Sequence, residues 1–191
     1  MKKLKFFSLL VLAISMANSA FAEAKKFNID PNHATVTWHA NHFGYSTPSG
    51  KFTDIKGVIS FDEKEPTQSS VDATINIASL NTGLPKFDEH LKSKDFFNLD
   101  KFTTAKFISK KVIIKGKNKG QIIGDLTLLG VTKPVTLNVT FNKMAVNSYT
   151  QKDTIGFSAT AAINRSDFGM NFGIPGVSDK VNLDIEIEGN I

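Results

Sequence analysis

The stretch VTLNVTFN, residues 135–142, alternates apolar and polar side chains at every position. Because successive side chains of a β-strand point to opposite faces, this pattern predicts a strand with one buried face. The same alternation returns over residues 155–163 and 181–187. The last third of the chain therefore predicts long, half-buried strands joined by short turns, which is typical of an antiparallel barrel or sandwich.

Shorter strands are expected upstream, over about residues 35–42, 51–55, 58–61, 71–77, 105–109, 112–115 and 121–129. The chain has sixteen Phe beside two Tyr and one Trp, whereas a barrel of the outer membrane carries girdles of aromatic residues with polar tips. The apolar faces are therefore expected to point inward. The prediction is an all-β fold, a single antiparallel β-barrel of about eight strands with an oily interior.

One segment breaks the strand pattern, LPKFDEHLKSKDFF over residues 84–97. Leu84, Phe87 and Leu91 recur at the spacing of one helical face, and Ser93 can cap a second short turn that ends in two Phe residues. The segment predicts a short helical insert. Its aromatic residues either pack beneath a connecting loop or gate a cavity, and both interpretations stay open.

Residues 1–22 have the three parts of a secretory signal peptide: a lysine-rich start, an apolar stretch over about residues 6–17, and Ala20-Phe21-Ala22 at the cleavage site. Cleavage before Glu23 leaves 191 − 22 = 169 residues, enough for one domain. The mature protein is expected in the periplasm. Its 23 − 3 = 20 basic residues nearly balance 18 acidic ones, which argues against a nucleic-acid partner. The absence of cysteine excludes disulfides and thiol chemistry.

A barrel of eight strands is either filled by its own side chains or holds one narrow ligand. Small residues at the inward-facing positions of the expected strands would leave room along the barrel axis. They are Ala40, Ala73, Ala159 and Ala161. The same residues also suit ordinary packing, so the pattern does not separate a hollow barrel from a filled one.

Several short motifs in a fixed order resemble the YceI-like family of exported lipid-binding barrels over residues 23–191. They are His33-x-x-Val36-x-Trp38-x-x-x-His42-Phe43-Gly44, Gly50-Lys51-Phe52, Asp88-x-His90-Leu91-x-Ser93-x-Asp95-Phe96-Phe97, the run over residues 124–133, Gly156-Phe157-Ser158-Ala159 and Arg165-Ser166-Asp167-Phe168-Gly169. The resemblance implies a lipocalin-like barrel with a long hydrophobic tunnel for a polyisoprenoid or another long-chain amphiphile, such as a fatty acid or amide. It implies no known reaction and no cofactor. Trp38 stands where the family often has Phe, so it affects the tunnel diameter.

Four histidines raise the alternative of a metal-dependent enzyme. His39 and His42 are three apart on an expected strand, so they point to opposite faces and cannot share one ion without a bulge. Asp88 and His90 do not face each other on a helix either. No catalytic residue and no metal ligand is therefore assigned. His42 shares the inward parity near a strand end and is expected to contact a lipid head group.

Arg165 is the only arginine of the chain. A single guanidinium among many lysines suggests a site that needs five N–H donors in one plane, which an ammonium group cannot supply. It either clamps an anionic head group or pairs with Asp167, Asp88 or Asp95 to hold the insert. The residues expected to bind ligand are Trp38, His42, Phe87, Leu91, Phe97, Phe157 and Arg165.

The function predicted from the sequence is a periplasmic lipid carrier, monomeric or homodimeric, with no catalysis. Five lysines surround one expected hairpin, Lys110, Lys111, Lys115, Lys117 and Lys119. They form either a solvated edge or a docking patch for an anionic membrane surface. The remaining alternative is a structural or stress protein whose barrel is filled and binds no ligand.

Overall fold

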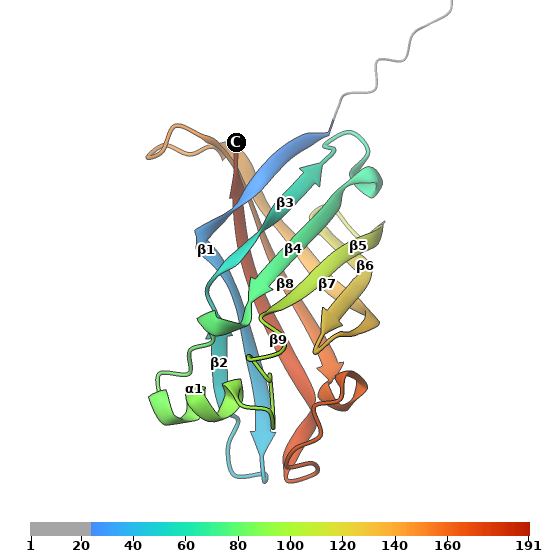
Figure 1. The fold of residues 1–191 in the computed structure, drawn as a ribbon. Helices are drawn as coiled ribbons and strands as arrows, with labels where there is room; N and C mark the ends of the chain where they lie inside the picture. Colours follow the sequence, from blue (N-terminus) through green and yellow to red (C-terminus); the bar gives the residue numbers. More distant parts are fainter. Residues whose placement is uncertain (1–23) are drawn as a thin grey trace, which may run out of the picture.

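The structure is a computed structural model that describes residues 24–191. The expected signal peptide, residues 1–22, lies outside these residues. Within them the chain is built mostly of strands, with one short α-helix (Figure 1). The strands are β1 (Lys25–His42), β2 (Ser49–Phe52), β3 (Ile55–Phe61), β4 (Ser70–Asn76), β5 (Thr104–Ile114), β6 (Lys119–Leu128), β7 (Val131–Val146), β8 (Asp153–Asn164) and β9 (Val177–Asn190). The helix is α1 (Pro85–Lys92), and three 3-10 turns are η1 (Pro66–Gln68), η2 (Ile77–Ser79) and η3 (Arg165–Phe168).

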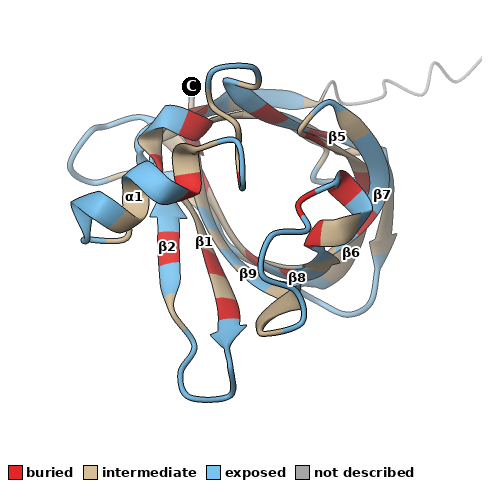
Figure 2. Cartoon of the chain, turned by 60° about the horizontal axis from the view of Figure 1, so that its bottom comes forward, coloured by how far each residue is buried: buried red, intermediate tan, exposed pale blue. Residues whose placement is uncertain are grey.

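Antiparallel pairing closes the sheet into a barrel. From β3 onward each strand pairs with the next, and β9 returns to pair with β1. The other edge of β1 pairs first with β3, over residues 25–28, and then with β2, over residues 36–39. Because β2 and β3 share one position beside β1, the closed barrel has eight strands, which confirms the predicted fold class (Figure 2).

The interior is divided along the barrel axis into two apolar clusters. One cluster is densely filled, with Phe27, Ile29, Ala34, Ile55, Ile59 and Ile155 buried at its centre. The other surrounds the opposite half and includes residues of α1 and η3. The second half borders a large apolar cavity. The terms filled half and hollow half are used for them below.

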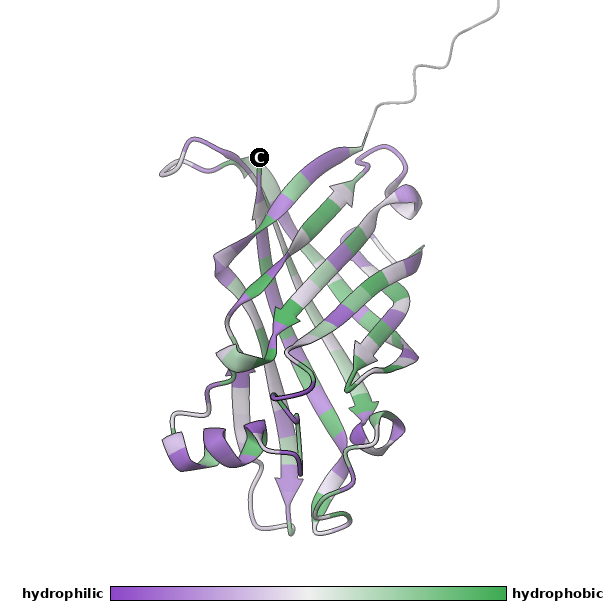
Figure 3. Cartoon of the chain, viewed as in Figure 1, coloured by the Kyte–Doolittle hydropathy of each residue, from purple (hydrophilic) through white to green (hydrophobic). Residues whose placement is uncertain are grey.

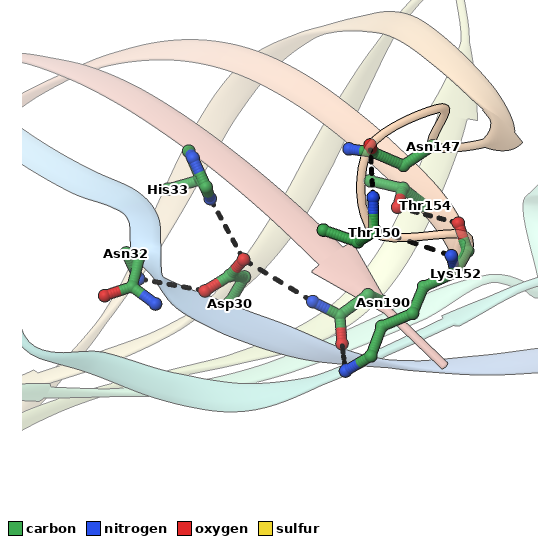
Figure 4. Close-up of polar contacts among 8 residues, drawn as sticks. All are labelled: Asp30, Asn32, His33, Asn147, Thr150, Lys152, Thr154 and Asn190. Carbon is green, nitrogen blue, oxygen red and sulfur yellow. Dashed lines mark hydrogen bonds and ion pairs between the residues drawn. The ribbon is translucent and has the colours of Figure 1, made fainter.

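Polar contacts tie the chain together at the end of the filled half (Figure 4). The Asp30 carboxylate accepts hydrogen bonds from the Asn32 amide at 3.0 Å and from His33 Nδ1 at 2.9 Å. Asn190 of β9 reaches the same carboxylate at 3.5 Å and accepts from Lys152 Nζ at 3.5 Å. The start of β1, the end of β9 and the β7–β8 loop are therefore held at one end of the barrel.

Two glycines, Gly130 in the β6–β7 turn and Gly124 in β6, stand where a larger residue would not fit. Leu129 and Gly130 join the strands with φ of 51° and 73°, the left-handed conformation that tight hairpins use. Gly124 lies opposite β5, where a Cβ would stand 2.4 Å from Phe107 Cζ and 2.6 Å from the Ile108 carbonyl oxygen. The run over residues 124–133 therefore forms a hairpin.

Element boundaries differ from the sequence-based expectation in several places. The strands expected over residues 105–109 and 112–115 form one strand, β5. The two strands expected over residues 51–55 and 58–61 lie at Ser49–Phe52 and Ile55–Phe61. Helix α1 begins at Pro85, so Leu84 is its N-cap and 62% exposed instead of sharing the inward face of Phe87 and Leu91. Helical spacing could not show that the first apolar residue precedes the helix.

We expect Gly124→Ala to destabilise the barrel by roughly 1–3 kcal/mol, because the added methyl group overlaps Phe107 and the β5 backbone. Gly116→Ala is the matched control, since a Cβ there has no neighbour within 4 Å. Urea unfolding of both variants measures the difference. Equal midpoints for the two variants would contradict the close approach of β5 and β6.

Candidate functional site

The hollow half encloses an apolar cavity of about 510 Å³. This volume falls within the range of small-molecule sites, about 300–1,000 Å³. The inward faces of the strands supply most of its wall, including Val36, Trp38, Ala40, Ile163 and Leu183. The short side chain of Ala40 explains part of the free space. Cavity-lining residues are absent from the buried centre of the filled half, so the cavity ends blindly there.

The segment around α1 forms one side of this cavity. Phe87, Leu91, Phe96 and Phe97 all line it. The Phe97 ring meets Phe52 of β2 edge-on at 5.4 Å between centroids, and Phe87 meets Trp38 at 6.3 Å. The predicted helical insert is therefore a wall of the cavity, packed against β1 and β2.

Asp88 fastens α1 to the loop before it. Its carboxylate accepts hydrogen bonds from the Thr82 amide at 2.7 Å and from Thr82 Oγ1 at 2.6 Å. These bonds lower the pKa of Asp88, because they stabilise the ionised form. Asp88 therefore positions the helix, and its contacts assign it no role as an acid or base beside His90.

The ring of Trp38 packs closely against the backbone of β2 at the cavity wall. It lies opposite Gly50 of β2, where a Cβ would stand 2.7 Å from Trp38 Cζ2. Its indole Nε1 is buried without an acceptor in residues 24–191. Gly50 therefore makes the space in which the large ring can lie against the β1–β2 pair.

Arg165 begins η3 and is 3% exposed. Its guanidinium donates to three backbone carbonyls, from Nε to Ser178 at 2.9 Å, from Nη1 to Met170 at 3.0 Å and from Nη2 to Val177 at 2.9 Å. Burial lowers its pKa and the nearby Asp179 opposes that shift. Arg165 thus clamps the loop between η3 and β9, and it also lines the cavity.

The expected ion-pair partners of Arg165 were wrong. Its guanidinium binds backbone carbonyls instead, and the carboxylate whose charge acts on it is that of Asp179. Asp179 accepts hydrogen bonds from the Ser166 amide and from Ser166 Oγ, both at 2.8 Å. These bonds and Arg165 lower the pKa of Asp179. Sequence proximity pointed to Asp167, but the return of β9 brings Asp179 to η3.

The cavity reaches the end of the barrel where β1 finishes and β9 begins. His42, Phe43, Phe172 and Val177 line it there. His90 of α1 and Phe172 of the η3–β9 loop meet edge-on at 5.5 Å, so the two sides of the opening touch. This opening is called the mouth below. It carries the cavity's ionisable side chains, His42, His90 and Arg165.

Six of the seven predicted ligand-binding residues line the cavity, namely Trp38, His42, Phe87, Leu91, Phe97 and Arg165. Phe157 does not. It lies in the filled half, where its ring contacts Phe61 at 6.0 Å and Phe141 at 5.6 Å. The prediction that Phe157 points into the barrel was right. The alternation of apolar and polar residues does not show, however, how far along the barrel axis a residue lies. Contact of the six with a ligand stays a prediction.

The sequence reasoning missed the loop between η3 and β9. Met170, Phe172 and Gly173 of this loop line the mouth, and so does His90 of α1. The available signal was the uncharged run GMNFGIPG over residues 169–176, which carries large apolar side chains without any strand or helix pattern.

The histidines are dispersed in residues 24–191. His39 faces outward and its Nε2 lies 2.9 Å from Asp184 Oδ2, while His42 lines the cavity. Within the described part of the chain, three or more His, Asp or Glu side chains nowhere come together as a metal site. In the same residues, none of the helices has the length and apolar character needed to cross a membrane.

Comparison with known proteins gives one family. The model described as YceI-like domain matches residues 27–189. A UPF0312 protein of Photorhabdus laumondii is 40% identical over 176 residues, which cover 91% of this chain and 89% of that protein. The YCEI protein of Campylobacter jejuni is 35% identical with a TM-score of 0.70, over 79% of this chain and 89% of that one. A polyisoprenoid binding domain from Saccharophagus degradans shares the fold, with a TM-score of 0.65 at 14% identity over 88% and 99% of the two chains.

We expect Arg165→Lys to lower the free energy of unfolding by roughly 1–3 kcal/mol, because an ammonium group cannot reach three separate carbonyls in the plane of a guanidinium. Hydrogen exchange should report faster opening of residues 169–178 than of β7. Unchanged exchange in that loop would show that the guanidinium does not hold it.

Acidification should loosen both sides of the mouth. The pKa values of Asp88 and Asp179 are lower in the folded state than in the unfolded state. The stability that these carboxylates contribute is therefore fully present above their unfolded-state pKa and is lost as the pH falls through their folded-state pKa. Amide exchange near residues 82–92 and 166–179, followed from neutral to acid pH, measures this. Asp179→Asn should remove the acid dependence of the second segment alone. A variant that keeps that dependence would contradict the assignment.

Proposed function

The chain belongs to the YceI-like family, and we propose that it is a periplasmic carrier that holds one long-chain amphiphile with its tail in the hollow half of the barrel. The observation that supports this most is the polarity of the cavity. Its wall is apolar from the blind end to the mouth, and its ionisable side chains gather at the mouth. An amphiphile has the same division between tail and head.

Burial of the tail provides the affinity in this proposal. Removing apolar surface from water contributes roughly 25 cal/mol per Å², or about 0.8 kcal/mol for each buried methylene group. A chain whose methylene groups follow one another into the cavity gains this stabilisation repeatedly without any polar contact. The length of the cavity then limits how much of a longer tail is enclosed.

The head group is proposed to lie at the mouth beside His42, His90 and Arg165. Arg165 has five donors, three of which bind backbone carbonyls, so two remain for an anionic or amide oxygen. An imidazole can donate or accept according to its protonation state. A phosphate, a carboxylate or an amide fits these groups.

The ligand class rests on the fold and on the cavity. The Saccharophagus degradans domain of the same fold is described as polyisoprenoid binding. A branched isoprenoid, a fatty acid and a fatty amide all satisfy the division of polarity, so each is a candidate. Periplasmic location rests on the signal peptide expected over residues 1–22.

Two alanines on the same strand test whether the hollow half holds the ligand. Ala40 lines the cavity, whereas Ala34 is 1% exposed in the filled half. We expect Ala40→Phe to fold with nearly unchanged stability, since the ring enters free space, and to lose most of the bound lipid. Ala34→Phe should lower the stability by roughly 1–3 kcal/mol, because it overpacks a filled core, and should keep its ligand.

The ligand is measured by purifying each protein without detergent, extracting it with organic solvent and analysing the extract by mass spectrometry. Wild type and Ala34→Phe should release a long-chain molecule in a near-stoichiometric amount. The carrier proposal fails if folded wild type releases none and takes up no added lipid. It also fails if Ala40→Phe retains the full amount.

A further inference from the structure

Apolar side chains are exposed around the mouth, although a cavity wall does not require them there. Tyr45 is 90% exposed, Leu84 62%, Phe43 59%, Phe172 48% and Ile174 36%. They come from the loop after β1, from the start of α1 and from the loop before β9, which lie at the same end of the barrel (Figures 1 and 2). These five residues are called the mouth rim.

The segments that carry the mouth rim are electrically neutral. Residues 43–50 and 169–178 contain no Asp, Glu, Lys or Arg. Over residues 85–97, the charges of Lys86, Lys92 and Lys94 are balanced by those of Asp88, Glu89 and Asp95. The mouth rim therefore presents exposed rings and aliphatic side chains on segments that carry no net charge.

The lysine-rich hairpin lies elsewhere. Leu126 and Leu128 of β6 line the cavity, and β6 begins at Lys119, so the turn between β5 and β6 lies toward the other end of the barrel (Figure 1). A protein docked through these lysines on an anionic surface would turn its mouth away from that surface. Hydrophilic and hydrophobic residues alternate along the strands (Figure 3), so hydropathy marks the two faces of the sheet and not the two ends of the barrel.

We propose that the mouth rim docks on the surface of a lipid bilayer, through apolar contact and not through charge. A bilayer matches the rim because it offers an uncharged apolar layer beneath its head groups, and tyrosine suits that boundary with its apolar ring and polar hydroxyl. The inference rests on the proposed function, because the rim surrounds the opening through which the amphiphile would pass. The tail can then move between leaflet and cavity without crossing water.

Phe172 connects this surface to the cavity. It belongs to the mouth rim and lines the cavity, and its ring meets His90 at 5.5 Å and Phe96 at 5.3 Å. A bilayer that takes up the Phe172 ring therefore acts directly on the contact that joins the two sides of the mouth.

The test uses three rim residues that do not line the cavity, Tyr45, Leu84 and Ile174. The variant Tyr45→Ser/Leu84→Ser/Ile174→Ser keeps the cavity wall, and serine is a favourable N-cap at position 84. Tyr149→Ser is the matched control, because Tyr149 is 95% exposed in the β7–β8 loop at the end of the filled half. Each protein is mixed with phosphatidylcholine vesicles, with and without added anionic phosphatidylserine, and separated by flotation at low and at high salt.

Wild type and Tyr149→Ser should float with the vesicles equally at both salt concentrations, and the triple variant should bind about tenfold more weakly. Equal flotation of wild type and the triple variant would overturn the proposal. So would binding that needs anionic lipid and disappears at high salt, which would assign docking to the lysine-rich hairpin. A wild type that does not float but dimerises through the rim would assign this surface to a second copy of the chain.

A second measurement separates this proposal from the carrier function. A fluorescent long-chain fatty acid is titrated into each protein in the absence of vesicles. The triple variant should bind this probe as wild type does, since its cavity wall is intact. Vesicle docking by a protein that binds no probe would leave the surface assignment standing and remove the carrier function. Probe binding without rim-dependent docking would do the reverse.

Discussion

The pairing of β1 with β9 is the constraint on which the rest of the structure depends. It joins the first strand of residues 24–191 to the last, from Asn28 opposite Asn190 to His42 opposite Val177. Without it, both strands would present open edges and the interior would be exposed to water. With it, every second residue of each strand points inward, so the alternation in the sequence becomes a closed apolar interior.

Closure alone does not make a cavity, because the two halves of the barrel use their inward residues differently. In the filled half, large side chains meet at the axis, as Phe27, Ile59 and Ile155 do. In the hollow half, Ala40 and Ala105 leave space, and the segment around α1 covers it with aromatic side chains. The filled half supplies core packing that does not depend on a ligand, which lets the other half remain open. Arg165 and Asp88 then hold the two sides of the mouth through hydrogen bonds to the backbone and to Thr82.

Sequence patterns predicted the inward faces of the strands well, because the side to which a residue points follows from local alternation. They placed Trp38 and His42 on the cavity side for the same reason. They failed for Phe157, because alternation does not show how far along the barrel axis a residue lies. They also failed for the acid near Arg165, because the position of Asp179 depends on how β9 pairs with distant strands. The mouth loop was missed because an irregular, uncharged segment has no period to recognise.

The central claim is that a lipid tail occupies the hollow half and stops at the filled one. Val36 and Ile75 pack against both apolar clusters and line the cavity, so they mark its blind end. The most direct measurement is an isotope-filtered NMR experiment on the protein with a bound long-chain fatty acid labelled at its terminal methyl group. Contacts from that methyl group to Val36 or Ile75, with none to Ile59 or Ile155, are the predicted result. A terminal methyl group that contacts Ile59 or Ile155, or that contacts no side chain inside the barrel, would contradict the account.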